Sequence, residues 1–361
     1  MPDQDCPSSP TRAATVSPLI TVGLITYNRM DMLREAVHSV LNQTHSGFHL
    51  IIGNDCPDIP VTLENLGCLG ETRVTILNRE KNLGEIANMN DLLQRAESPW
   101  FTWLADDDLF HPECFRELLR VIDEGGEGIS AAYSNYTSSA APTNIFHLPL
   151  QNRRAQLCQS RRFIRAYAAR KYPLVGCFGL MKTEVLKRAG GILQLGNSFS
   201  PYCDTLLPIL MAEHGDICWV DLPLVFLRTH KLSRSVSSSD FEGYTTAETD
   251  FIRELRRVCG STRINMSPEE CVKHMIFWFI YNEWGVLLRN PRLNRFSVVR
   301  IFVLYQFRVN FPRLAPKYWL PCLIYTLRVM HRRSIFHVRS WCIKFMRKIS
   351  GVVSILKTSR S

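Results

Sequence analysis

Residues 98–112 read Ser-Pro-Trp-Phe-Thr-Trp-Leu-Ala-Asp-Asp-Asp-Leu-Phe-His-Pro. The apolar, aromatic stretch 100–104 is typical of a buried strand, and three carboxylates, Asp106, Asp107 and Asp108, follow where it stops. Consecutive like charges repel, so folding alone gives little reason to place them there. Two explanations stand: a divalent cation such as Mg²⁺ or Mn²⁺ binds their oxygens, or the run is a solvated turn in which Asp108 caps a helix starting near Pro112.

Strands and helices are predicted to alternate upstream of this acidic run. Runs rich in β-branched and other apolar residues predict strands at 19–26, 48–53 and 74–77. Helical spacing predicts one helix capped by Asp31 and a second from Glu85 to Ala96. This alternation favours an α/β domain with a mostly parallel sheet.

Polar residues follow the predicted strands where they end. These are Thr26-Tyr27-Asn28, Asn54-Asp55 and the Asp triplet. Because ligands of such sheets bind outside the carboxyl ends of the strands, we expect the three segments to line one crevice. Neither of the common glycine-rich phosphate-binding motifs is present. The phosphates of a bound nucleotide must therefore be held through a metal ion and side chains.

Charge is distributed unevenly along the 361 residues. The formal net charge is +10, but residues 289–361 hold 16 Lys and Arg and no Asp or Glu. The first 288 residues hold 27 basic and 33 acidic side chains. With 46% apolar and 21% charged residues, the composition is that of a globular protein. The sequence thus predicts a mildly acidic body with a strongly basic C-terminal region.

Cysteine spacing and the chain ends bear on the compartment. The twelve cysteines form no C-x-x-C pair and no metal-ligand spacing, which favours a reducing, cytoplasmic compartment. Residues 1–17 are rich in Pro, Ser and Thr and are expected to be a disordered leader. No apolar run reaches the roughly 20 residues that a membrane-spanning helix needs.

Several short motifs in order carry a resemblance to a known family. The sequence resembles the family 2 glycosyltransferases of the GT-A fold, strongly from Leu19 to about Pro112 and more loosely to about Ser235. The motifs are Thr26-Tyr27-Asn28-Arg29, Ser39-Val40-Leu41-Asn42-Gln43-Thr44, Asn54-Asp55, Asn82-Leu83-Gly84 and Ala105-Asp106-Asp107-Asp108. The resemblance implies a GT-A fold, a mixed α/β sheet flanked by helices, and a nucleotide-sugar donor.

The resemblance also implies site residues. It places a divalent cation, Mn²⁺ or Mg²⁺, at Asp107 and Asp108, and the nucleotide base at Tyr27 and Asp55. The full set implied for the UDP- or dTDP-sugar donor is Thr26, Tyr27, Asn28, Arg29, Asp55, Asn82, Gly84, Asn90, Asp106 and His230. The chain departs from the family at Asn54 and Ala105, which stand where acids are common, so the division of labour within the Asp triplet is open, with Asp107 favoured.

A fourth acidic position, Asp204, follows Cys203 at the start of a predicted helix. The structural explanation is a helix cap or a first-turn acid favoured by the helix dipole. The resemblance instead places the catalytic base here, although Cys203 replaces the acid that often precedes it. One base opposite the leaving group predicts single displacement with inversion at the anomeric carbon.

Two function classes follow. The first is a metal-assisted inverting glycosyltransferase that acts on a glycan or lipid-linked acceptor in cell-surface polysaccharide or glycolipid synthesis. The alternative is a non-catalytic nucleotide-sugar or glycan-binding protein on the same scaffold. The basic segment 135–170 is expected on the acceptor side, strands are predicted at 174–181 and as a closing pair at 217–230, and the GT-A domain is predicted to span 18–240.

Residues 241–361 are predicted to form a mostly helical, basic region. Helices are expected up to Cys259 and from the capping segment at Ser267 to Leu288. An apolar stripe from Ile335 to Leu356 with basic residues opposite suits the surface of an anionic membrane, at its cytoplasmic face. A helical cap or an oligomer interface remains an alternative, and no recognition motif supports nucleic acid as a partner.

Overall fold

The computed structural model describes residues 19–140, 154–197, 200–230, 233 and 237–333. The predicted disordered leader (1–17) and the predicted amphipathic stripe at 335–356 lie outside these described residues.

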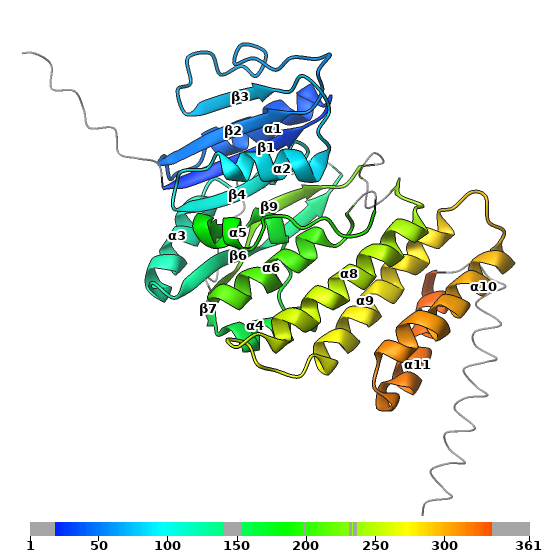
Figure 1. Cartoon of the computed structure of the whole chain (residues 1–361). Helices are drawn as coiled ribbons and strands as arrows, with labels where there is room; N and C mark the ends of the chain where they lie inside the picture. Colours follow the sequence, from blue (N-terminus) through cyan, green and yellow to red (C-terminus); the bar gives the residue numbers. More distant parts are fainter. Residues whose placement is uncertain (1–18, 141–153, 198–199, 231–232, 234–236, 334–361) are drawn as a thin grey trace, which may run out of the picture.

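The first half of the chain forms the parallel part of a sheet, as predicted. Strands run in the order β3-β2-β1-β4, and each adjacent pair is parallel (Figure 1). Their bounds are β1 Ile20–Thr26, β2 Phe48–Asn54, β3 Val74–Asn78 and β4 Trp100–Ala105, and the connecting helices are α1 Met30–Leu41 and α2 Glu85–Gln94. Because the strands are parallel, their carboxyl ends lie at one edge of the sheet.

The second half continues the sheet with strands of both directions. The order is β4-β8-β6-β9-β5, with β7 paired to β9. Strand β8 is antiparallel to both neighbours, whereas β6 and β9 are parallel. The bounds are β5 Leu109–Phe110, α3 Cys114–Gly125, β6 Ile129–Ser139, β7 Ala155–Cys158, α4 Ser160–Ala168, β8 Leu180–Lys182, α5 Thr183–Arg188, α6 Cys203–His214 and β9 Asp216–Arg228. The fold is the mixed α/β architecture that the sequence predicts.

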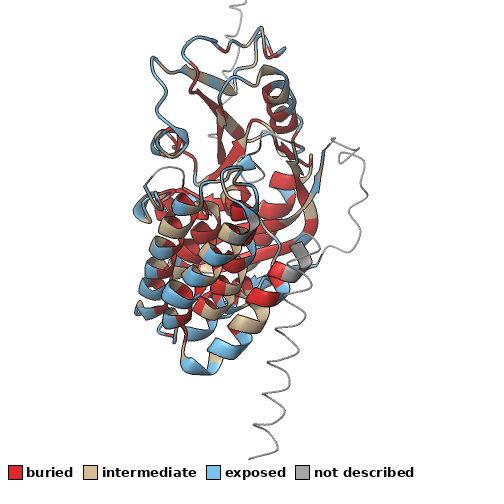
Figure 2. Ribbon diagram, turned by 90° about the vertical axis from the view of Figure 1, so that its right-hand side faces the viewer, coloured by how far each residue is buried: buried red, intermediate tan, exposed pale blue. Residues whose placement is uncertain are grey.

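Two apolar cores lie on opposite faces of the sheet. Helices α1 and α3 bury Val37 and Phe115 in one core. Helices α2, α4, α5 and α6 contribute to the other, which continues into the C-terminal helices through Phe251 and Phe279. Figure 2 shows this buried interior passing from the sheet into the helices. The C-terminal helices thus share a core with the sheet domain.

The C-terminal helices are α8 Phe241–Gly260, α9 Glu269–Leu288, α10 Arg295–Tyr305 and α11 Trp319–Arg333, with short helical turns at Gln306–Asn310, Phe311–Arg313 and Pro316–Tyr318 between the last two. Helices α8 and α9 lie side by side beyond α6 (Figure 1). The predicted helix from the Ser267 segment to Leu288 is confirmed. Among the helices in the described ranges, none combines the length and apolarity needed to cross a membrane.

Two strand predictions were wrong. Residues 174–181 form a 3₁₀ turn at Gly176–Phe178 before the short β8. A side-chain carbon at Gly176 would lie 1.8 Å from the Asp204 carbonyl oxygen, so this glycine permits the turn to press on α6. Residues 217–228 do not form a strand pair but belong to the single strand β9, in which Pro223 is tolerated at a β-bulge against β6, and Thr229 and His230 follow its end.

Two predicted helix caps are also absent. Helix α1 begins at Met30, and Asp31 lies in its first turn beside Arg34. Helix α3 begins at Cys114, and Asp108 instead accepts a hydrogen bond from the backbone N–H of Arg228 at 2.9 Å. The solvated-turn explanation of the acidic run is therefore wrong, because Asp108 is bound to the end of β9.

Candidate active site

The ends of β1 and β4 meet at the first carboxylate of the triplet. Thr26 donates its hydroxyl to Asp106 Oδ2 at 2.7 Å, and the backbone N–H of Tyr27 donates to the same oxygen at 3.3 Å. The two strands are paired in register up to Ile25 and Ala105, so these groups face each other across the sheet edge. Asp106 is 1% exposed and fixes the position of the 26–29 segment.

Asp107 contacts two basic side chains from distant segments. Arg29 Nη1 lies 2.7 Å from Asp107 Oδ2, and its Nη2 lies 3.2 Å from Asp106 Oδ1. His230 Nε2 lies 2.9 Å from the same Asp107 oxygen. Residues that the sequence analysis had grouped only by resemblance are thus in direct contact.

Asp108 is bound to the end of β9 through Arg228. Besides its backbone bond to Asp108, Arg228 donates Nε to the Asp107 carbonyl oxygen at 3.1 Å. Its Nη2 lies 2.6 Å from Glu35 Oε2 on α1. Arg228 therefore links three segments around the triplet, a role that the sequence signals only by its place before His230.

Burial disfavours the charged forms of Asp106 and Asp108. Desolvation raises the pKa of Asp106 to about 6, opposed by Arg29. Burial and the charge of Asp107 raise the pKa of Asp108 to about 8. A cation at this edge would relieve both effects.

The oxygen donors of Asp107 and Asp108 fit Mg²⁺ or Mn²⁺ chemically. Within the described ranges, no three His, Cys, Asp or Glu side chains are arranged to hold a metal ion by themselves. A cation bound here would therefore take further ligands from the phosphates of the donor or from water.

Asp55 organises the loop in front of α2. Its two oxygens accept the backbone N–H groups of Leu83 at 2.7 Å and Gly84 at 2.9 Å. Gly84 has φ of 84° and also donates to Asn82, so the turn requires a residue that tolerates this conformation. The predicted Asp55, Asn82 and Gly84 thus form one unit.

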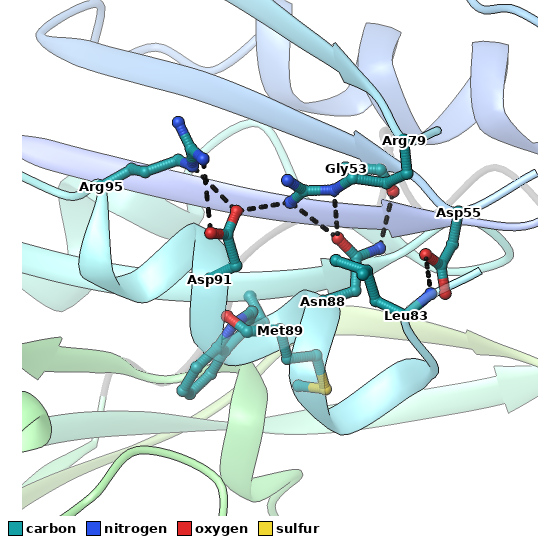
Figure 3. A network of polar contacts seen from close by, with 9 residues as sticks. Gly53, Asp55, Arg79, Leu83, Asn88, Met89, Asp91 and Arg95 are labelled. Carbon is teal, nitrogen blue, oxygen red and sulfur yellow. Dashed lines mark hydrogen bonds and ion pairs between the residues drawn. The ribbon is translucent and has the colours of Figure 1, made fainter. Parts of the chain in front are cut away.

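Helix α2, which follows the 82–84 turn, is hydrogen-bonded to the end of β2 (Figure 3). Asn88 donates its amide to the Gly53 carbonyl oxygen at 2.9 Å and accepts from Arg79. Arg79 also pairs with Asp91 at 2.6 Å. This network supports the strand end from behind. The sequence analysis assigned no role to it.

A small hollow lies beside the strand ends of β1 and β2. Asn28, with φ of 55°, and Arg29 lie on one side of it, and Tyr27 next to them is 52% exposed. The lining residues are Thr26, Asn28, Arg29, Met30, Leu33, Asn54, Ile59 and Val61. Polar side chains thus line part of this hollow, and the exposed ring of Tyr27 belongs to the residue next to its lining residue Asn28.

Asn90 is engaged elsewhere. Its amide donates to the Ile192 carbonyl oxygen at 2.9 Å and accepts the Ile192 N–H at 3.0 Å. Both polar ends of the side chain hold the segment after α5. The structure does not bring Asn90 into contact with the strand-end carboxylates, and its expected donor contact stays a prediction.

Asp204 lies in the first turn of α6, after Tyr202, whose φ is 73°. Burial raises the pKa of Asp204. The thiol of Cys177, in the turn pressed on α6, has its pKa raised by burial and then by the charges of Asp204, Cys203 and Asp108. Asp204 and Asp108 therefore both act electrostatically on this thiol.

Two further residues lie on the Asp204 side: Arg170, which ends the basic segment expected on the acceptor side, and Trp278, to which the sequence assigned no role. Arg170 follows α4 with φ of 60°, and its guanidinium lies 4.2 Å from the ring centre of Trp278 on α9. The charge of Arg170 opposes the rise in the pKa of Asp204, and Trp278 contacts Tyr202 at 4.9 Å between ring centres. Because α4 and α9 are far apart in the chain, no local pattern could pair these two residues.

Structural neighbours share this fold at low sequence identity. The chain superposes on the S. aureus TarS fragment 1–349 in complex with UDP-GlcNAc with a TM-score of 0.54 and 14% identity, covering 86% of this chain and 81% of that one. The same fragment in complex with UDP gives a TM-score of 0.51. These similarities confirm the GT-A fold.

Sequence relatives are glycosyltransferases by name. An uncharacterized glycosyltransferase of Haemophilus influenzae is 25% identical over 65% of this chain and 76% of its own length. The putative teichuronic acid biosynthesis glycosyltransferase TuaG of Bacillus subtilis is 29% identical over 37% of this chain and 54% of its length. The putative colanic acid biosynthesis glycosyl transferase WcaA of Escherichia coli is 31% identical over 27% of this chain and 35% of its length.

The matching family model is described as "Glycosyl transferase family 2" and covers residues 21–189. This stretch holds β1 to α5 with the crevice segments Thr26–Arg29, Asp55 and the Asp triplet. Asp204, His230 and the C-terminal helices lie beyond it. Residues 21–189 thus match the model of glycosyl transferase family 2, over a little less than half of the chain.

Proposed function

We propose that this glycosyltransferase moves a sugar from a nucleoside diphosphate donor to a hydroxyl of a glycan or lipid-linked acceptor, with inversion and with the help of a divalent cation. The observation that carries the proposal is the strand-end carboxylate cluster, Asp106, Asp107 and Asp108, together with the half-buried Asp204, which acts on the same Cys177 thiol as Asp108. A diphosphate leaving group needs positive charge, which a cation at the strand-end carboxylates would supply. An acceptor hydroxyl needs a general base, which Asp204 would supply.

The donor is proposed to lie along the strand ends. The base is proposed to bind at the hollow beside Tyr27 and Asn28, and Arg29 and His230, which both contact Asp107, are proposed to bind the diphosphate. Uridine is favoured because TarS is described in complex with UDP-GlcNAc and with UDP; a dTDP donor is the second choice. Asp107 and Asp108 would hold the cation, which would supply Lewis-acid charge at the leaving diphosphate.

Asp204 is proposed as the general base. Its raised pKa makes it a stronger proton acceptor than an exposed carboxylate. It takes the proton of the acceptor hydroxyl while that oxygen attacks the anomeric carbon, and the diphosphate leaves from the opposite face. One displacement with the base and the leaving group on opposite faces inverts the anomeric configuration.

The acceptor is proposed to approach past Arg170 and Trp278, beside Asp204. Cell-surface polysaccharide synthesis is favoured by the names of TuaG and WcaA. The catalytic domain is proposed to span 18–240, and the basic region 241–361 to attach it to the cytoplasmic face of an anionic membrane. Cosedimentation with anionic and neutral liposomes at low salt tests this attachment, which loss of binding to the anionic vesicles would contradict.

The test of the main proposal uses the full chain with Mn²⁺ and a panel of UDP-, dTDP- and GDP-sugars. Thermal shift identifies the nucleotide, and donor turnover with water or added acceptors is then followed. We expect cation-dependent turnover of one nucleotide class and, in transfer products, the inverted anomer by NMR. Nucleotide binding without any turnover in the presence of extracts that contain acceptors would favour the binding-protein alternative.

A further inference from the structure

Arg29 contacts two of the three strand-end carboxylates at once. Its Nη1 lies 2.7 Å from Asp107 Oδ2 and its Nη2 lies 3.2 Å from Asp106 Oδ1. The arginine side chain is 34% exposed, whereas the carboxylates are 13% and 1% exposed. The guanidinium therefore covers these oxygens from the open side of the crevice.

A guanidinium and a divalent cation would bind the same carboxylate oxygens. Arginine stays charged at every working pH and binds carboxylates through hydrogen bonds. Mg²⁺ and Mn²⁺ prefer the same carboxylate oxygens. Two cations at one carboxylate oxygen repel each other, so full coordination of a metal ion by Asp107 requires the Arg29 side chain to withdraw. A diphosphate offers that side chain a stronger, doubly charged partner.

We propose that Arg29 competes with the divalent cation for Asp106 and Asp107, and that the donor diphosphate relieves this competition by binding the guanidinium. The inference rests on the proposed function in taking the cation and the diphosphate as ligands of one site. It predicts that nucleotide and cation strengthen each other's binding by the same factor, as linkage requires. Arg29 would thus make cation binding depend on the donor.

Arg228 supplies a matched comparison within the same site. It is also an arginine beside the triplet, but its guanidinium contacts Glu35 and the Asp107 backbone oxygen. Its removal takes away a nearby positive charge without freeing a carboxylate oxygen of the triplet. Arg34, whose guanidinium contacts Asp31 and the Asn65 carbonyl oxygen, is the surface control.

The experiment measures the Mn²⁺ dissociation constant of the full chain by electron paramagnetic resonance, with and without UDP, or GDP if thermal shift selects it. Arg29→Ala is expected to bind Mn²⁺ about tenfold more tightly without nucleotide, a typical size for a coupling between sites. The mutual strengthening of Mn²⁺ and UDP is expected to shrink in this variant. Arg228→Ala is expected to change Mn²⁺ affinity less, and Arg34→Ala not at all.

Two results would overturn the inference. One is an Arg29→Ala protein whose Mn²⁺ affinity is unchanged or weaker; the other is an equal gain in Arg228→Ala, which would indicate long-range electrostatics. If no protein binds Mn²⁺ under either condition, the inference also fails, while UDP binding alone still supports the donor part of the proposed function. Circular dichroism checks folding, and Arg29→Gln, which keeps the volume of the side chain, replaces any variant that does not fold.

Discussion

Two groups of carboxylates differ in their surroundings: the strand-end carboxylates and a second acidic cluster in the C-terminal helices. The second cluster, called the helix cluster here, contains Glu248, Glu283, Tyr305, Gln306, Asn310 and Arg313. Glu248 and Glu283 are both 0% exposed. Arg313 lies 2.8 Å from Glu248, and Tyr305 donates its hydroxyl to the same carboxylate at 2.8 Å. Gln306 donates to Glu283 at 3.2 Å.

The two clusters differ in the position of the arginine that compensates the carboxylate charge. In the helix cluster, burial and the charge of Glu248 raise the pKa of Glu283 well above its usual range, and Arg313 serves Glu248 from inside the protein. At the strand ends, Arg29 approaches from the open side. Buried, internally paired carboxylates hold helices together, whereas carboxylates at an open edge remain available to a ligand.

The largest effect is expected at Asp204, the proposed base. Asp204→Asn keeps the shape of the side chain but removes its proton affinity, so transfer is expected to fall about 1,000-fold. Binding of the nucleotide and thermal stability should stay close to those of the unmodified chain. Initial rates with saturating donor provide the measurement.

Asp31→Asn is the matched control, because Asp31 is also a first-turn acid but lies exposed on α1. It is expected to leave the rate unchanged. A folded Asp204→Asn protein with near-full transfer would remove Asp204 from the role of base and would weaken the contrast between the two clusters.

Breaking the helix cluster should affect stability and spare donor binding. Arg313→Met leaves Glu248 buried without its charge partner, which is expected to cost about 3 kcal/mol of unfolding free energy. Urea denaturation gives the free energy, and titration with the nucleotide gives the affinity. Arg257→Met, which removes an exposed ion pair with Glu213, is expected to cost less than about 1 kcal/mol. Equal costs in the two variants would show that burial of the pair is not decisive.

The pH dependence of stability tests whether the buried Glu283 is held protonated. A carboxyl with a raised pKa in the folded chain binds its proton more tightly than in the unfolded chain, so its contribution to stability is present at low pH and declines as the pH rises above the unfolded value near 4.5. Glu283→Gln imitates the protonated form. It is expected to be about 1–2 kcal/mol more stable than the native chain at pH 8 and nearly equal at pH 5.

Glu270 provides a control of opposite sign. Hydrogen bonds from Lys273 and Tyr318 lower its pKa to about 2, so its contribution is present at neutral pH and is lost as the pH falls. Glu270→Gln should therefore not gain stability at pH 8. A Glu283→Gln protein with the same pH profile as the native chain would mean that Glu283 is not held protonated.

The smallest effect concerns Asn90, which the family resemblance assigns to the donor. Asn90→Ala removes two hydrogen bonds to Ile192 and is expected to cost about 1–2 kcal/mol of stability. The KM for the donor should change less than about twofold. A large rise in KM with unchanged stability would instead place Asn90 in the donor site.

Much of the arrangement at the strand ends could be predicted from the sequence. Apolar runs that end in Thr26, Asp55 and the Asp triplet predict strands, and parallel strands in turn predict that their polar ends meet. The structure confirms this meeting at Asp106, which accepts from both Thr26 and Tyr27. The prediction failed where local patterns mislead, as at Gly176–Phe178, whose apolar residues turn to accommodate α6.

By itself, the sequence determined the α/β alternation, the strand ends and the acidic residues there, because side-chain periodicity is local. Only the tertiary structure decided which charges compensate them. Arg29 reaches Asp107 over 78 residues of chain and Arg228 reaches Asp108 over 120, and Arg170 meets Trp278 across two helices. Such pairs depend on how layers pack, and no periodic pattern encodes them. Burial, which sets the pKa of Asp108 and of Glu283, likewise exists only in the folded chain.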